Sequence, residues 1–237
     1  FLSNRRNFVF GSVISSGPER NELQLVTGLI EDEAFYGCCN LGSIKIPDSV
    51  TVIKEEAFHG CTNLTSIIIP DSVTYIGERA FADCCNLTSI KISSSIEVIE
   101  KEAFSGCKNL TSVSIPNSVT CIRKEAFFGC SKLKTLKIPD SVTVIEGGVF
   151  GKCFKLSSLN IPDSVTSLGE KLFTRCYSLH TISFPKSMDL IGRGIFCGFC
   201  GLIYFKIPNS VVIIGAQAFK NATKLRSVKI PDSVQAI

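Results

Sequence analysis

Twelve cysteines are the side chains with the widest chemical potential in this chain of 237 residues. The motif Cys197-Gly-Phe-Cys200 has the spacing of a thiol redox centre or of half a zinc site. A zinc site needs a second pair and a redox motif needs its own helical context, so drift of a repeat explains this motif better. Seven other cysteines recur every 23 residues, and we interpret them as buried free thiols that fill apolar space: Cys38, Cys61, Cys84, Cys107, Cys130, Cys153 and Cys176.

Acid–base catalysis has few candidate residues in this sequence. The two histidines, His59 and His180, lie about five of these repeats apart, roughly 25 Å at the spacing of neighbouring strands. Serine is abundant but periodic, and the chain has neither a glycine-rich phosphate loop nor an HExxH motif. We therefore expect no enzymatic activity, no cofactor and no metal.

The composition favours a folded scaffold. Hydrophobic residues make up 45% of the chain and charged residues 19%, which argues against disorder. No apolar run approaches the roughly 18 residues that a membrane-spanning helix needs. The net charge of +4 is too small to indicate a nucleic-acid partner.

Phenylalanine, leucine and proline keep the same 23-residue period, which must be explained before any site. Nine phenylalanines form a lane at Phe35, Phe58, Phe81, Phe104, Phe127, Phe150, Phe173, Phe196 and Phe219. A leucine lane and a proline lane keep the same step, and only Ser93 interrupts the prolines. The chain is therefore an array of repeats, and each unit must bury its apolar face against its neighbours.

One unit contains a strand signal and a helix signal. Leu41, Ile44 and Ile46 include a period-2 step that predicts a short strand, which Pro47 ends. From Ile53 to Cys61 the apolar residues fall at i, i+4, i+5 and i+8, which predicts about two helical turns. We therefore predict an α/β repeat solenoid that winds to the right, with a parallel β-sheet on a concave face and short helices on a convex face.

The unit Leu-x-x-Ile-x-Ile-Pro-Asp-Ser-Val-x-x-Ile-x-x-x-Ala-Phe-x-x-Cys resembles the BspA-like, treponemal-type leucine-rich repeats of bacteria and protists. The resemblance covers about residues 30–237. It implies a leucine-rich-repeat solenoid and, more loosely, an adhesin that displays repeats at a cell surface. Ordinary leucine-rich repeats carry Asn or Cys nine positions into the unit, where this chain always has serine. We expect this serine lane to bond nearby backbone in the turn.

Two lanes of the predicted strands should point to the concave face. The third position carries mostly Ser or Thr, and the fifth position carries the lysine lane, Lys45, Lys91, Lys137, Lys206 and Lys229. An aspartate lane follows the prolines at Asp48, Asp71, Asp140, Asp163 and Asp232. This face suits a protein or glycan partner, or an anionic ligand along the lysines. It could equally be a solvated face on which Lys and Asp partly neutralise one another.

Tyr204 is the best single candidate for a binding anchor, because other units carry Ser or Thr at its position. Stacking of the units should place His180, Thr181 and Arg226 beside it. Off-phase Phe199 and Phe205 are expected to replace Cys and Ile in the core.

The ends of the chain suggest a fragment of a longer protein. Residues 1–29 fit the repeat poorly and are predicted to be an N-terminal cap or a degenerate repeat, whereas 30–237 form about nine repeats that should continue beyond the C-terminus. Two functions remain open: a surface or secreted adhesin-like module that binds a matrix or host protein or a glycan, and a scaffold subunit of a large intracellular assembly. The resemblance favours the first, and the unpaired-looking cysteines favour the second.

Overall fold

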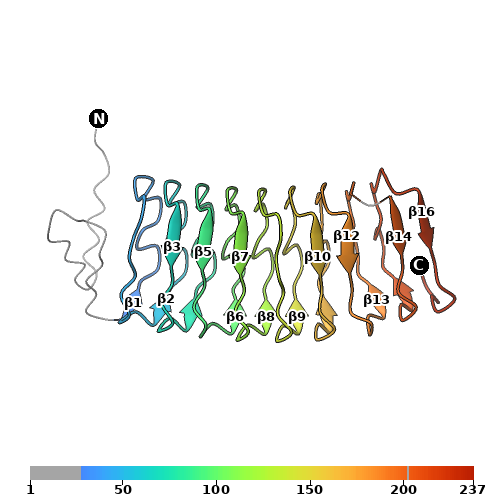
Figure 1. The fold of residues 1–237 in the computed structure, drawn as a ribbon, viewed down its shortest axis with the longest axis horizontal. Helices are drawn as coiled ribbons and strands as arrows, with labels where there is room; N and C mark the ends of the chain where they lie inside the picture. The colour runs from blue at the N-terminus through green and yellow to red at the C-terminus, as the bar shows by residue number, and fades with distance from the viewer. Residues whose placement is uncertain (1–27, 202) are drawn as a thin grey trace.

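The repeats form a stack of coils that lie side by side along one long axis (Figure 1). This computed structural model describes residues 28–201 and 203–237. Each coil corresponds to one 23-residue unit, and parallel strands join it to its neighbours. The predicted parallel solenoid is confirmed, whereas its right-handed winding stays a prediction.

The first side of each coil carries the predicted strand. Its middle residue is apolar and points into the core, while its flanking residues face solvent. Corresponding residues pair directly, as Ser66, Ser89 and Ser112 do. These strands are β3 (Ser66–Ile68), β5 (Ser89–Lys91), β7 (Ser112–Ser114), β10 (Ser158–Asn160), β12 (Thr181–Ser183), β14 (Tyr204–Lys206) and β16 (Ser227–Lys229). We call this side, which faces the viewer in Figure 1, the strand face.

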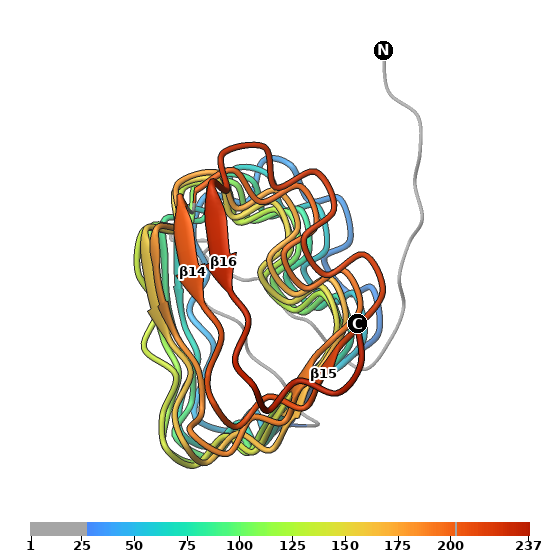
Figure 2. The same ribbon diagram turned by 90° about the vertical axis from the view of Figure 1, so that its right-hand side faces the viewer.

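A second row of short parallel strands was not predicted. It follows the proline and serine lanes in each coil and lies on another side of the stack (Figure 2). Each strand ends on a branched apolar residue, usually Ile, which enters the core. The row consists of β1 (Leu29–Ile30), β2 (Val52–Ile53), β4 (Tyr75–Ile76), β6 (Val98–Ile99), β8 (Cys121–Ile122), β9 (Val144–Ile145), β11 (Ser167–Leu168), β13 (Leu190–Ile191) and β15 (Ile213–Ile214).

The predicted convex helices are wrong, because the described residues contain no helix. Within a coil, the N–H of Cys61 donates to the carbonyl of Phe58, three residues back rather than four. Alternate N–H groups donate to the next coil rather than within their own. The N–H of Phe58, for example, donates to the carbonyl of Ala80. Glu56 and Gly60 have φ values of 52° and 69°, which interrupt any right-handed helix. We call this side of each coil the turn ladder.

The phenylalanine lane forms the centre of the core. Phe58 and Phe81 stack at a centroid distance of 5.2 Å, and Phe104 and Phe127 stack at 5.5 Å. Phe199 and Phe205 are buried, as expected for core replacements. Residues 1–27 of the predicted cap lie outside the described residues, so the boundary at residue 29 stays a prediction.

Candidate functional site

The lysine lane lies on the strand face, where its side chains are exposed. It follows from strand geometry: the fourth and sixth positions of each unit point inward, so the fifth points outward. Apart from Lys45, these lysines have no carboxylate oxygen within 4.0 Å in the described part of the chain. Direct pairing with the aspartate lane therefore does not neutralise Lys91, Lys137, Lys206 or Lys229.

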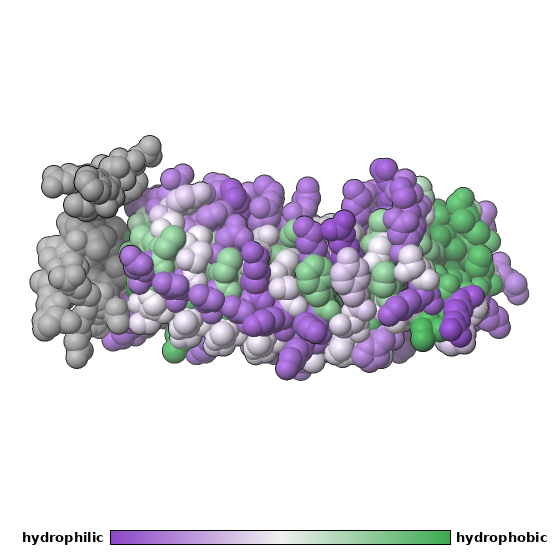
Figure 3. All heavy atoms as spheres, turned by 90° about the horizontal axis from the view of Figure 1, so that it is seen from above, coloured by the Kyte–Doolittle hydropathy of each residue, from purple (hydrophilic) through white to green (hydrophobic). Residues whose placement is uncertain are grey.

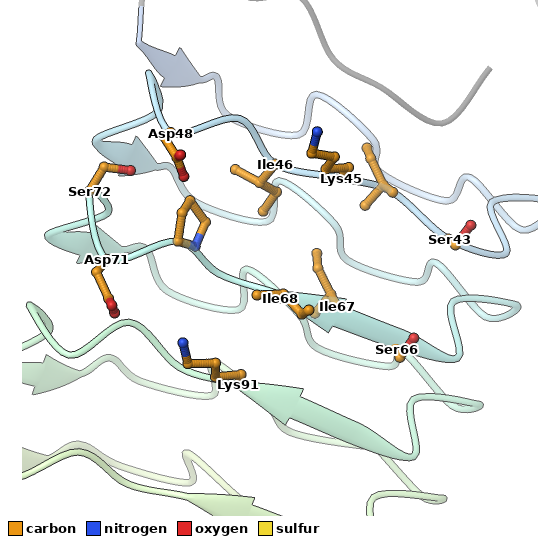
Figure 4. A pocket seen from close by; sticks show the side chains of 12 residues that line it. Ser43, Lys45, Ile46, Asp48, Ser66, Ile67, Ile68, Asp71, Ser72 and Lys91 are labelled. Atoms are coloured by element: carbon orange, nitrogen blue, oxygen red, sulfur yellow. The ribbon is translucent and has the colours of Figure 1, made fainter. Parts of the chain in front are cut away.

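Three hollows follow the strand face, and together they include every member of the lysine lane. The first, of about 730 Å³, contains Lys45 and Lys91, and the exposed Ile68 of the intervening coil lies between them (Figure 4). The second, of about 350 Å³, contains Lys137 with Thr135, Asn160 and other polar residues. The third, of about 400 Å³, contains Lys206 and Lys229, which pair in register across β14 and β16. The face therefore offers cations at intervals along a line.

Four members of the aspartate lane, Asp48, Asp71, Asp140 and Asp232, line these hollows together with the lysines. Asp71 accepts a hydrogen bond of 2.9 Å from the backbone N–H of Ser94 in the next coil. That bond, then the Ser94 hydroxyl and the charge of Lys91, lower the pKa of the Asp71 carboxyl. Asp163 accepts the equivalent bond from the Lys186 N–H, which lowers its pKa in the same way. The hollows therefore contain lysines together with carboxylates, and the bond from Ser94 fixes the carboxylate of Asp71.

The sequence suggested that the serine hydroxyls bond backbone within their own turn. This expectation is wrong. Ser141 donates from Oγ to the carbonyl of Val119 at 2.7 Å, and Ser164 donates to Val142 at 2.8 Å, so each hydroxyl links its coil to the preceding one. In the coil without the lane proline, Ser93 is buried and donates to Val73. By the period, the Val73 carbonyl would be the acceptor for Ser95, the lane serine of this coil. Because Ser93 donates to it, Ser95 donates to the Asp71 carbonyl instead.

Comparison with known families decides what kind of array this is. The model of the BspA type leucine rich repeat region matches residues 28–155 and 144–237, with six copies. The chain belongs to the BspA type leucine rich repeat family. A leucine-rich repeat protein from Bacteroides ovatus is 24% identical, with a TM-score of 0.58 over 91% of this chain and 74% of that one. The Treponema pallidum leucine-rich repeat protein is 23% identical, with a TM-score of 0.56 over 89% and 86% of the two chains.

These likenesses establish the fold of this BspA-type array. Comparison with curated proteins found no match. Leucine-rich repeats are in general protein-interaction modules and a non-enzymatic class, and the family model places the chain among them. Within the described residues, no helix is long and apolar enough to cross a bilayer.

The in-phase cysteines of the BspA-type units are free, and all except Cys38 are buried. Each buried thiol approaches the carbonyl of the preceding coil's phenylalanine, as Cys130 does with Phe104 at 3.3 Å. Burial raises the pKa of Cys61 and of Cys176 to about 12. These thiols are therefore protonated at neutral pH and are poor nucleophiles.

Cys197 and Cys200 are also free. Cys200 Sγ lies 3.3 Å from Thr223 Oγ1 of the next coil. No group of three or more His, Cys, Asp or Glu side chains suited to a metal occurs among the described residues.

Tyr204 is 66% exposed in β14, and Arg226 directly precedes Ser227, which pairs with Tyr204 in register. His180 and Arg226 belong to the residues just before the strands, and both are exposed. The ring Nδ1 of His180 lies 2.8 Å from its own coil's Ser178 carbonyl. None of the three lines the hollows described above. Their shared role stays a prediction.

An ionic network on the turn ladder was missed by the sequence analysis. Arg79 pairs with Glu56 of the preceding coil and lies 3.5 Å from Glu102 of the following one. His59 is buried against Tyr36, with ring centroids 4.8 Å apart, and Asp83 lies 3.8 Å from its Nε2. A step of 23 residues between opposite charges would have signalled the pairs of Arg79 with Glu56 and with Glu102, because the period brings these side chains into contact.

Proposed function

We propose that this chain is a non-enzymatic module that binds a protein or glycan partner through its strand face. The observation that carries the proposal is the alignment of all five lane lysines along three open hollows of one face. Hydroxyl, amide and carboxylate groups between the lysines add directional hydrogen bonding. Such an array suits an extended partner that carries acidic groups at intervals.

The rigidity of the face supports this function. Coils are joined by backbone ladders on several sides and by the serine lane, so the lysines project from fixed positions. A fixed surface loses little conformational entropy when it binds, apart from the lysine side chains themselves. The exposed Ile68 between Lys45 and Lys91 adds an apolar contact to the first hollow.

The adhesin-like form of this proposal places the chain at a cell surface or in secreted form, as the family resemblance implies. It predicts that intact cells labelled with a membrane-impermeant reagent yield labelled protein. The retained partner should then be a matrix protein, a host protein or a glycan.

A scaffold role in a large intracellular assembly is the second candidate, and the free cysteines favour it. Free thiols persist more readily in a reducing compartment than in an oxidising one. In this case the endogenous protein stays unlabelled and co-purifies in a fixed stoichiometric complex.

The role of the strand face is tested by charge reversal. The variant Lys91→Glu with Lys137→Glu should lower partner affinity at least about tenfold, and the loss should shrink at high salt. The matched control, Lys124→Glu with Lys171→Glu, reverses two exposed cations of the turn ladder and should bind like the parent. Equal binding by parent and strand-face variant would show that this face is not used.

A further inference from the structure

A third side of the stack carries cations that the strand-face proposal does not use. In each coil, four residues between the cysteine lane and the strand join the turn ladder to the strand face, for example 131–134 and 154–157. Backbone bonds stack these segments: the Lys132 N–H donates to the Lys108 carbonyl at 3.1 Å, and the Lys155 N–H donates to Ser131 at 3.2 Å. We call this side the basic ridge. It forms the upper edge in Figures 1 and 2, and Figure 3 looks down on it.

The basic ridge contains no acidic residue in any described coil. Its segments are 39–42, 62–65, 85–88, 108–111, 131–134, 154–157, 177–180, 200–203 without residue 202, and 223–226. Lysines gather in its middle, at Lys108, Lys132, Lys134 and Lys155, and all four are exposed. Hydrophilic residues extend along much of this side in Figure 3.

These ridge lysines are also unpaired. Within the described residues, no carboxylate oxygen lies within 4.0 Å of their ammonium groups. In the N-terminal half of the turn ladder, by contrast, several cations meet carboxylates one coil away, as Lys101 meets Glu78 at 3.2 Å and Arg123 meets Glu100 at 3.3 Å. The middle of the basic ridge therefore carries cations without carboxylates, and a patch of one sign attracts a polyanion.

An aromatic pair lies beside these lysines and narrows the type of polyanion. Phe154 and Tyr177 stack with centroids 5.3 Å apart and planes 3° apart, and Tyr177 is 47% exposed. The two facing surfaces of the rings are covered by each other. Single-stranded nucleic acids are held by bases that stack on open ring faces, and the stacked pair offers fewer such faces than two separate rings would.

We propose that the basic ridge binds a linear sulfated polysaccharide. Lysine ammonium groups are point charges with free rotation, which suits sulfate groups spread along a flexible chain. A planar carboxylate of an acidic peptide would instead be held best by the bidentate fork of arginine. The polymer would lie along the stack and cross one coil after another, with the Tyr177 hydroxyl available for hydrogen bonding.

Heparin is the probe for this proposal, and titration at several salt concentrations is the measurement. The ridge variant Lys132→Gln with Lys155→Gln should bind heparin about tenfold more weakly than the parent. The slope of log Kd against log salt should fall by about two, roughly one for each lysine removed. The matched control is Lys124→Gln with Lys171→Gln on the turn ladder, which should retain parental heparin binding. Thermal unfolding of both variants should match the parent, because all four side chains are exposed.

Two results would overturn the proposal. Equal heparin affinity of the parent and the ridge variant would show that the ridge is not the site. Equal or tighter binding of a single-stranded oligonucleotide or of polyglutamate, at matched charge, would show that the ligand class is wrong. Strand-face partner binding is measured separately, so its failure would leave the heparin result unaffected.

Discussion

At the scale of single residues, the coils are joined by polar groups that reach backward along the stack. The Ser141 hydroxyl and the Cys130 thiol each contact a backbone carbonyl of the preceding coil. An interior carbonyl without a partner is costly, so these donors stabilise the interfaces between coils. The period indicated that serine and cysteine are structural. Whether the acceptor lay in the same coil or the preceding one depends on the coil's path, which the period does not specify.

Removing one serine hydroxyl tests this role. Ser141→Ala should lower the free energy of unfolding by about 1–2 kcal/mol, because the Val119 carbonyl loses its 2.7 Å donor. Ser187 belongs to the same lane but is exposed and has no such bond, so Ser187→Ala should change stability by less than about 0.5 kcal/mol. Urea denaturation of both variants measures the difference. Equal costs would argue against a stabilising bond between coils.

The buried thiols predict a loss of stability at alkaline pH. Burial raises the pKa of Cys107, Cys130 and Cys153 well above the usual thiol range. In the unfolded chain these thiols ionise at about pH 8.5. The folded state therefore holds protons that the unfolded state releases. The stabilisation is complete below the unfolded pKa and is lost as pH rises above it, by about 1.4 kcal/mol per pH unit for each thiol.

Urea midpoints measured between pH 7.5 and 10 check this slope. In Cys130→Ser the stability should fall less steeply, by the contribution of one thiol, because serine does not ionise in that range. A parent midpoint that stays constant across the range would contradict the buried, protonated state of the thiol ladder.

At the scale of elements, the strands of the strand face were predicted, whereas the second row of strands was missed and the predicted helices are turns. Alternation of Leu, Ile and Ile specifies which residues of the strand enter the core. In the turn ladder, the spacing of Ile53, Ala57, Phe58 and Cys61 marks the buried residues correctly, and all four are buried. The same spacing arises from consecutive tight turns that bond to the next coil. Glycine at Gly60, Gly106 and Gly129 was the signal for these turns, since each has positive φ.

A glycine-to-alanine pair tests the turn ladder. At Gly129 the φ is 74°, and a Cβ would lie 3.6 Å from the backbone N of Gly106, so space is adequate and only conformation opposes it. Gly129→Ala should therefore cost about 1 kcal/mol. Gly42 has no atom within 4 Å of an added Cβ and lacks a positive φ, so Gly42→Ala should be close to neutral. Equal stability of the two variants would be inconsistent with left-handed turns.

At the scale of the whole molecule, stability depends on how many neighbours each coil has. Phe127 is fully buried in the middle of the array, whereas Phe219 near the C-terminal end is only partly buried. The lysine lane could be predicted because it follows the period and strand alternation. The grouping of Tyr204 with His180 and Arg226 stays a prediction, because it depends on where side chains of neighbouring coils point, which the period does not specify.

Truncation of the phenylalanine lane tests the stacked organisation. Phe127→Ala should cost about 3–5 kcal/mol, since coils on both sides lose packing around the cavity. Phe219→Ala should cost less, because its surroundings are less closed. Denaturant unfolding of both variants, followed by fluorescence and by circular dichroism, gives the two values. Equal losses would contradict the order of coils.

The most direct test of the proposed function is lysine acetylation of the chain alone and with its purified partner, mapped by mass spectrometry. Binding through the strand face predicts protection of Lys45, Lys91, Lys137, Lys206 and Lys229, with unchanged reactivity at Lys54, Lys101 and Lys124 of the turn ladder. Protection of the turn-ladder lysines, with the strand-face lysines still reactive, would contradict the assignment of the strand face as the binding surface.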